Sequence, residues 1–167
     1  MFRSSSARTR SATPLTISAP SWAGSMCTRS RICGEEQGQT VDVSDEQAVA
    51  TFFSKLATFD HLVFTAGDSL HLHDLAATDL QQARRAFELR YWAVLAAVKY
   101  GSPHTRKEGS VVLTTGIAGQ RPQKGWVIAA NVCGATEALT RALAVELAPI
   151  RLTRYLPESC GQTSGRA

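Results

Sequence analysis

The chain lacks long apolar runs and is poor in cysteine, and each shortage excludes a class of protein. None of its apolar runs approaches the roughly 18 residues of a membrane-spanning helix, so we predict no membrane association. Its four cysteines have no Cys-x-x-Cys spacing and are too sparse for a disulfide scaffold or a zinc knuckle. The 167 residues are 44% hydrophobic and 19% charged, as in an ordinary globular protein with one hydrophobic core.

Acidic residues are missing from the first 33 residues, which contain five arginines. The formal net charge of +4 comes from the two ends, because residues 34–150 hold ten basic and thirteen acidic residues. Nucleic-acid binding needs positive charge clustered on a folded face, so we predict no nucleic-acid partner. The Arg- and Ser-rich segment 1–33 has the composition of a mitochondrial transit peptide or, the interpretation we prefer, of a disordered or non-native tail. We therefore expect a cytoplasmic protein, with a mitochondrial location as the alternative.

From Gln37 onward, short apolar strands alternate with helices. The sequence predicts strands at 39–43, 61–65 and 110–114, a further short strand at 15–18, and helices at 44–57, 79–100 and 127–147. Ser44 and Gln47 have the spacing of a capping box at the start of the first helix. Apolar strands that alternate with helices specify a parallel sheet covered on both sides, so we expect a doubly wound, three-layer α/β/α fold.

Two glycine turns, Ala66-Gly67 and Thr115-Gly116, follow directly after predicted strands. The carboxyl ends of parallel strands meet at one edge of the sheet, where open α/β sheets bind their ligands. The sequence therefore predicts a cofactor site at this edge.

Four segments resemble the short-chain dehydrogenase/reductase family over about residues 39–152. Segment 41–43 resembles the strand whose Asp hydrogen-bonds the adenine ring, and segment 64–67 resembles the family's Asn-Asn-Ala-Gly turn. Segment 109–116 resembles the strand that leads to the catalytic Ser, and segment 138–148 closely resembles the helix that carries the catalytic Tyr and Lys. The resemblance implies a Rossmann-like fold, NAD or NADP as cofactor, and a small carbonyl or alcohol substrate. It assigns cofactor binding to Asp42, Val43, Thr65, Ala66, Gly67 and Thr115.

All four positions that carry catalysis in the family are altered here. The alignment places Ala129 at the Tyr, Cys133 at the Lys, Gly116 at the Ser with Thr115 beside it, and Arg90 at the Asn of the long central helix. An alanine cannot transfer a proton, so we assign no catalytic residue. An atypical subgroup of the family also lacks Tyr and Lys and keeps Arg in the central helix. If this chain belongs to that subgroup, Arg90 is the subgroup's arginine and could bind an anionic group. The alternative is that Arg90 is a surface or interface arginine.

Both ends of the chain depart from the family pattern. Residues 1–33 contain Gly24 alone, whereas the family begins with a Gly-x-x-x-Gly-x-Gly turn that holds the pyrophosphate. We expect dinucleotide affinity to fall by roughly several kcal/mol without these backbone donors. Codons for residues 152–164 can be chosen so that reading them two bases later gives a sequence close to the family's continuation. One deleted base near codon 153 would produce this shift. We therefore hypothesise a frameshift there, and a second one within residues 22–33. We expect an atypical segment 1–33, a Rossmann-like core 34–152 that is incomplete at both ends, and a non-family tail 153–167.

The remaining candidates concern metals and partners. A metal site would draw on a His- and Asp-containing loop, but loop geometry argues against it and we assign no metal; the candidate ligands are His61, Asp68, His71, His73 and Asp74. Helices 79–100 and 127–147 correspond to the family's dimerisation helices, which implies a homo- or hetero-oligomer.

Three functions stay open from the sequence. The first is an NAD(P)-dependent oxidoreductase of the family's type, impaired in this form. The second is a non-catalytic pseudoenzyme or interaction module that pairs through its dimer helices. The third is a truncated gene product without a function of its own.

Overall fold

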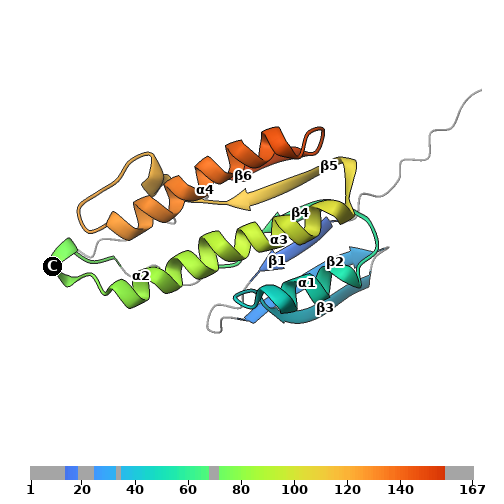
Figure 1. Cartoon of the computed structure of the whole chain (residues 1–167), viewed down its shortest axis with the longest axis horizontal. Coiled ribbons are helices and arrows are strands. Elements are labelled where there is room, and N and C mark those ends of the chain that lie inside the picture. The colour runs from blue at the N-terminus through green and yellow to red at the C-terminus, as the bar shows by residue number, and fades with distance from the viewer. Residues whose placement is uncertain (1–13, 19–24, 33–34, 68–71, 157–167) are drawn as a thin grey trace, which may run out of the picture.

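The computed structural model describes residues 14–18, 25–32, 35–67 and 72–156. Six strands form one sheet in the order β3-β2-β1-β4-β5-β6 (Figure 1). Their bounds are β1 (Pro14–Ser18), β2 (Ser25–Ile32), β3 (Glu35–Asp42), β4 (Phe59–Phe64), β5 (Thr105–Thr114) and β6 (Arg151–Tyr155). Strands β1, β4, β5 and β6 pair in parallel, and this arrangement confirms the predicted Rossmann-like α/β class.

The first three strands pair differently from the rest of the sheet. Strand β2 is antiparallel to both β1 and β3. Six residues separate β1 from β2 and two separate β2 from β3. A parallel crossover needs a dozen or more residues, so connections this short permit only antiparallel neighbours.

The helices follow the predicted order with small changes in their bounds. Helix α1 (Glu46–Ser54) connects β3 to β4, and α4 (Val127–Glu146) connects β5 to β6. The predicted helix 79–100 is one continuous rod made of α2 (Leu80–Phe87), the π turn η2 (Glu88–Trp92) and α3 (Ala93–Gly101). Single 3-10 turns η1 (Leu75–Ala77), η3 (Ser102–His104) and η4 (Ile117–Gly119) lie between these elements.

The predicted capping box of α1 is wrong. The N-cap is Asp45, whose carboxylate accepts the backbone N–H groups of Gln47 at 2.9 Å and Ala48 at 3.2 Å. Ser44 instead donates its hydroxyl to Asp42 at 2.6 Å. Asp and Ser cap equally well, and the charge of Asp45 also suits the positive end of the helix dipole.

The helices cover one face of the sheet. Right-handed crossovers from β3 to β4, β5 and β6 all run in the same direction across the sheet, which puts α1, α3 and α4 on the same side. In Figure 1 these helices lie in front of the strands. Alternate strand residues are accordingly buried or half-buried: Leu62 and Val111 are buried beneath the helices, whereas Val63 and Val112 on the other face are half-buried.

The second helical layer that we expected is absent from the described residues. Its crossover helices would lie between β1, β2 and β3, where the connections are too short to contain them. The fold of the described chain is therefore an α/β sheet with one helical layer. Within the described residues, no helix has both the length and the apolar character needed to cross a membrane.

Candidate functional site

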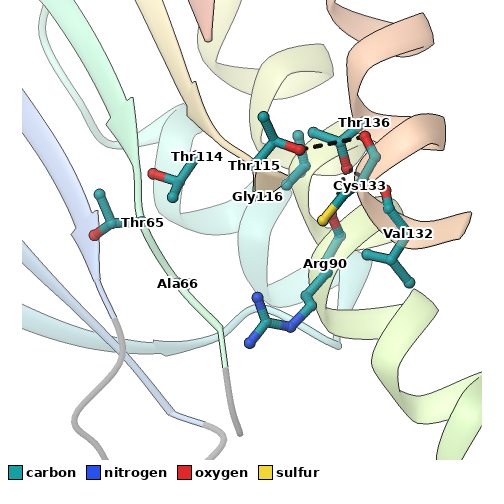
Figure 2. A pocket seen from close by; sticks show the side chains of 10 residues that line it. Thr65, Ala66, Arg90, Thr114, Thr115, Gly116, Val132, Cys133 and Thr136 are labelled. Atoms are coloured by element: carbon teal, nitrogen blue, oxygen red, sulfur yellow. Dashed lines mark hydrogen bonds between the residues drawn. The ribbon is translucent and has the colours of Figure 1, made fainter. Parts of the chain in front are cut away.

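A cavity of about 210 Å³ lies where β4 and β5 end, between the π turn η2 and helix α4 (Figure 2). Both strands run in parallel, so their carboxyl ends meet at this edge, as the sequence predicted. The cavity is lined by Thr65, Ala66, Arg90, Val94, Thr114, Thr115, Gly116, Val132, Cys133 and Thr136.

Arg90 reaches the cavity from the π turn. Its side chain extends toward the end of β4 near Ala66 (Figure 2). A Cβ built on Gly67 would lie 3.1 Å from three guanidinium atoms of Arg90, so the guanidinium rests directly against the backbone of Gly67. A glycine at this position is what allows the close approach. Single π turns inside α-helices occur frequently at functional sites because they re-aim side chains.

Thr115 and Cys133 join the end of β5 to α4. The Thr115 hydroxyl donates to the Cys133 carbonyl at 3.2 Å, and the Thr115 N–H donates to the carbonyl of Tyr155 at 3.0 Å. A Cβ on Gly116 would lie 3.1 Å from the Cys133 sulfur, so this side of the cavity is closely packed.

The four altered catalytic positions divide between the cavity and the interior. Cys133, Gly116 and Arg90 line the cavity. Ala129 is buried and packs with Ala118 and Cys133 in a small apolar cluster. The position that corresponds to the family's proton donor therefore presents a methyl group in a closely packed interior.

The predicted cofactor residues separate into two groups. Thr65, Ala66 and Thr115 line the cavity, and Gly67 borders it through its contact with Arg90. Asp42 and Val43 instead lie at the carboxyl end of β3 and do not line the cavity.

The two residues beside β3 have different surroundings. The Asp42 carboxylate is exposed and accepts the N–H of Ser44 at 2.9 Å. Val43 is buried in the main core and borders a second cavity of about 420 Å³. Because β2 and β1 stand between β3 and β4, the two groups are separated by three strand spacings, about 14 Å. An extended dinucleotide can bridge such a distance along the edge of a sheet.

Of the described residues, those at the cavity offer a polar atom that a cofactor could use, whereas the centre of the predicted dinucleotide site lacks the helix of the family's pattern. At the cavity, the buried Thr114 hydroxyl has no hydrogen-bond partner within the described structure, so it is available to a ligand. At the centre, the family's pattern needs a helix that begins directly after β1. Here β1 is followed by an antiparallel strand instead, and residues 19–24 lie outside the described part of the chain.

The described residues contain no group of three or more His, Cys, Asp or Glu side chains that would hold a metal ion. Of the candidate ligands, Asp68 and His71 lie outside the described residues. His61 is placed on β4, where its Nδ1 lies 3.0 Å from the hydroxyl of Ser110.

Several cavity residues were not selected from the sequence. Arg90 was noted as an altered position but was not included among the binding residues. Val94 follows Arg90 by four residues, and Val132 precedes Thr136 by four, so each pair shares one face of its helix. This spacing is the sequence feature that could have identified these cavity residues. By itself it does not show which face of the helix lies against the carboxyl edge of the sheet.

The chain belongs to the short-chain dehydrogenase/reductase family. A family model described as an SDR-like Rossmann domain matches residues 2–162. Among curated relatives, the short-chain dehydrogenase/reductase ATR9 of Stachybotrys chlorohalonatus is 33% identical over 132 residues, which is 72% of this chain and 51% of ATR9. The short-chain dehydrogenase/reductase malC of Malbranchea aurantiaca is 33% identical over 109 residues, or 62% of this chain and 41% of malC. The chain thus spans about half the length of the curated relatives it matches.

Solved structures show the same fold. A small-chain dehydrogenase in complex with NADPH superposes with a TM-score of 0.66 at 34% identity, covering 68% of this chain and 52% of that one. The MalC reductase/Diels-Alderase of Malbranchea aurantiaca has a TM-score of 0.62 at 28% identity, with 70% of this chain and 48% of that one covered.

Proposed function

We propose that this protein binds NAD or NADP and acts as an oxidoreductase on a small carbonyl or alcohol substrate, with impaired catalysis in this form. The observation that carries the proposal is the cavity at the ends of β4 and β5, which brings Thr65, Ala66 and Thr115 together. The NADPH complex of a similar dehydrogenase supports a nicotinamide cofactor.

The cofactor would lie along the carboxyl edge of the sheet. Thr65, Ala66, Gly67 and Thr115 would hold its nicotinamide end, and Asp42 and Val43 its adenine end. When bound, the nicotinamide ring supplies or accepts a hydride. We expect weak binding, because no described helix begins after β1 to receive the pyrophosphate.

The chain's own residues explain why we expect slow turnover. Ala129 has no proton to donate, and the hydroxyl of Thr115 is already engaged with the carbonyl of Cys133. A positioned general acid typically contributes about 10²- to 10⁴-fold to a rate. We therefore expect turnover at least about a hundredfold below that of a relative with the full Tyr-Lys pair.

The test is a titration of the full chain with NADPH and NADH, followed by turnover with a panel of ketones and aldehydes. The double variant Ala129→Tyr/Cys133→Lys puts the family's pair back. Because Ala129 is buried beside Ala118, circular dichroism first checks that the variant keeps its fold. We expect the folded variant to turn over at least about tenfold faster than the unmodified chain, because a general acid contributes about 10² or more and imperfect packing reduces this gain. Ala138→Tyr is the matched control, because it adds the same side chain at an exposed position of α4. The proposed cofactor binding is refuted if neither nucleotide shows saturable binding. The proposed impairment of catalysis is refuted if the unmodified chain turns over substrate as fast as a relative that has the Tyr-Lys pair.

A second candidate function is an interaction module that pairs with a related chain. The observation that favours it is the exposure of large apolar side chains on the two long helices: Trp92 is 53% exposed and Val145 is 83% exposed. Mixing the chain with a full-length relative and measuring that relative's activity and mass in solution separates this function from turnover by the chain itself.

A further inference from the structure

The second cavity, of about 420 Å³, lies between the start of α1 and the rod of η2 and α3, which are neighbours in Figure 1. It is separate from the cavity at the ends of β4 and β5, and Asp42 does not line it. Trp92 is the one aromatic residue among the residues that line it, and this residue is 53% exposed. The cavity therefore combines an indole open to solvent with an apolar wall, which is made by Val43, Ala93, Leu95 and Ala96.

The charged residues of this cavity leave one carboxylate without a counter-ion. Two carboxylates, of Glu46 and Glu88, and one ammonium group, of Lys99, line it. Lys99 pairs with Glu46 at 2.8 Å, and the hydroxyl of Tyr100 donates to the same carboxylate at 2.7 Å. None of the ion pairs among the described residues includes Glu88, although Arg84 lies one turn earlier in the rod. The cavity therefore favours a cation beside Glu88.

The π turn η2 places this carboxylate and the indole on the same cavity. Glu88 is its first residue and Trp92 its last, and both side chains line the cavity. The Tyr91 ring packs against the indole at 86°, with 5.1 Å between ring centroids, and this contact restricts the indole. The face of an indole attracts cations. A guanidinium suits such a pair best, because it is planar enough to stack on the ring and its N–H fork matches a carboxylate.

We propose that this cavity binds a guanidinium group on an alkyl stem, with the indole of Trp92 stacked on the guanidinium and Glu88 as its counter-ion. Val43, Ala93 and Ala96 provide apolar contacts for the methylene groups of the stem. An arginine side chain of a partner peptide and a free guanidino compound share this chemistry. The inference goes beyond the proposed function, which gives Glu88 and Trp92 no role.

The experiment compares two ligands of nearly the same shape, using the full ¹⁵N-labelled chain without nucleotide. N-acetylargininamide carries the guanidinium, and N-acetylcitrullinamide carries a neutral urea in its place. Nuclear magnetic resonance follows the backbone amides of Ala93 and Ala96, which line the cavity. We expect the arginine compound to bind about three- to thirtyfold more tightly, because an exposed cation–π contact contributes about two- to fivefold and an exposed ion pair up to about fivefold. Equal affinities would overturn the assignment.

Two further ligands test the shape of the cation and its source. N-acetyllysinamide has the same charge without the planar fork, so tighter binding of it than of N-acetylargininamide would contradict a guanidinium site. Butylguanidine lacks the peptide groups and is compared with butylurea. If butylguanidine binds as tightly as N-acetylargininamide, a free guanidino compound is a sufficient ligand. If it binds more weakly than N-acetylargininamide but more tightly than butylurea, the ligand is an arginine within a peptide. No preference over butylurea would overturn the proposal.

Variants locate the cation. Glu88→Gln removes the counter-ion and should weaken binding of N-acetylargininamide up to about fivefold while leaving N-acetylcitrullinamide unchanged. Trp92→Leu removes the ring and should weaken it about two- to fivefold, and Trp92→Phe should give an intermediate affinity. Glu146→Gln, at an exposed position of α4, is the matched control and should bind like the unmodified chain. Full affinity for N-acetylargininamide in both Glu88→Gln and Trp92→Leu would refute the site.

Circular dichroism checks the fold of each variant, and the comparison of the arginine and citrulline compounds on the unmodified chain decides the proposal if a variant does not fold. The outcomes also separate this inference from the proposed function. Selectivity for the guanidinium without NADPH or NADH binding refutes the proposed function alone. Nucleotide binding without this selectivity refutes only the guanidinium site.

Discussion

Glu137 is the buried carboxylate of α4, and its replacement by Gln tests how this end of the molecule is held together. The residue is 8% exposed. One carboxylate oxygen accepts from Arg154 of β6 at 2.9 Å, and the other accepts from the side chain of Gln120 at 3.3 Å. A single side chain thus joins α4 to the edge strand β6 and to the segment that follows η4.

The expected loss of stability depends on how far the Glu137 and Arg154 side chains are exposed to water. A hydrogen bond to a charged group contributes about 1.5–3 kcal/mol net. The Arg154 side chain is 37% exposed, so water recovers part of its hydration when the pair is broken. Glutamine keeps the shape of the side chain and a carbonyl acceptor. We therefore expect Glu137→Gln to lower the free energy of unfolding by about 1–2 kcal/mol, or the melting temperature by about 2–8 °C for a domain of this size.

Thermal and urea unfolding followed by circular dichroism measure this change. Glu146→Gln is the matched control, because Glu146 is exposed on the same helix and should change stability by less than about 0.5 kcal/mol. If the pair is responsible, Arg154→Gln in the Glu137→Gln background should cost less than it does alone. Unchanged stability of Glu137→Gln, or full additivity of the two substitutions, would refute this reasoning.

Two further predictions concern acid stability and packing. The hydrogen bond from Lys99 lowers the pKa of Glu46 below its ordinary value, so its stabilisation is present above about pH 4.5 and is lost as the pH falls through the folded-state pKa. Glu46→Gln should remove this part of the pH dependence in urea unfolding between pH 6 and 3, and an unchanged pH profile would contradict the assignment. A methyl group on Gly109 would collide with the Asp60 carbonyl of β4, so Gly109→Ala should abolish the native circular dichroism spectrum. A Cβ built on Gly134 of α4 would meet no neighbouring atom within 4 Å, so Gly134→Ala should stabilise the protein by about 0.5–1 kcal/mol, and the reverse order of stability of the two glycine variants would contradict this packing.

Much of the parallel half of the fold could be predicted because its signals are local. The runs that became β4 and β5 are apolar and bounded by glycine turns, and the rod 80–101 and α4 have apolar residues at helical spacing. In the antiparallel half, strands were predicted at 15–18 and 39–43, whereas β2 carried no such signal. Strand β2 is rich in Ser and Arg, and its eight residues are strand because β1 and β3 pair with it on both sides. Pairing with a neighbouring strand is a tertiary contact, and local composition does not show it even when that strand lies close by in the chain.

The candidate site shows the same division. The turns Ala66-Gly67 and Thr115-Gly116 were predicted to meet at one edge of the sheet, since residues that follow parallel strands lie there, whereas Thr65 was assigned through the family resemblance. The arrival of Arg90 and Cys133 at that edge was decided by the tertiary structure. The π turn sets the direction of Arg90, and the packing of α4 on the end of β5 determines that Cys133 faces the cavity while Ala129 is buried. Sequence determines which residues can form a strand or helix, but long-range packing decides which side chains of separate elements share a cavity.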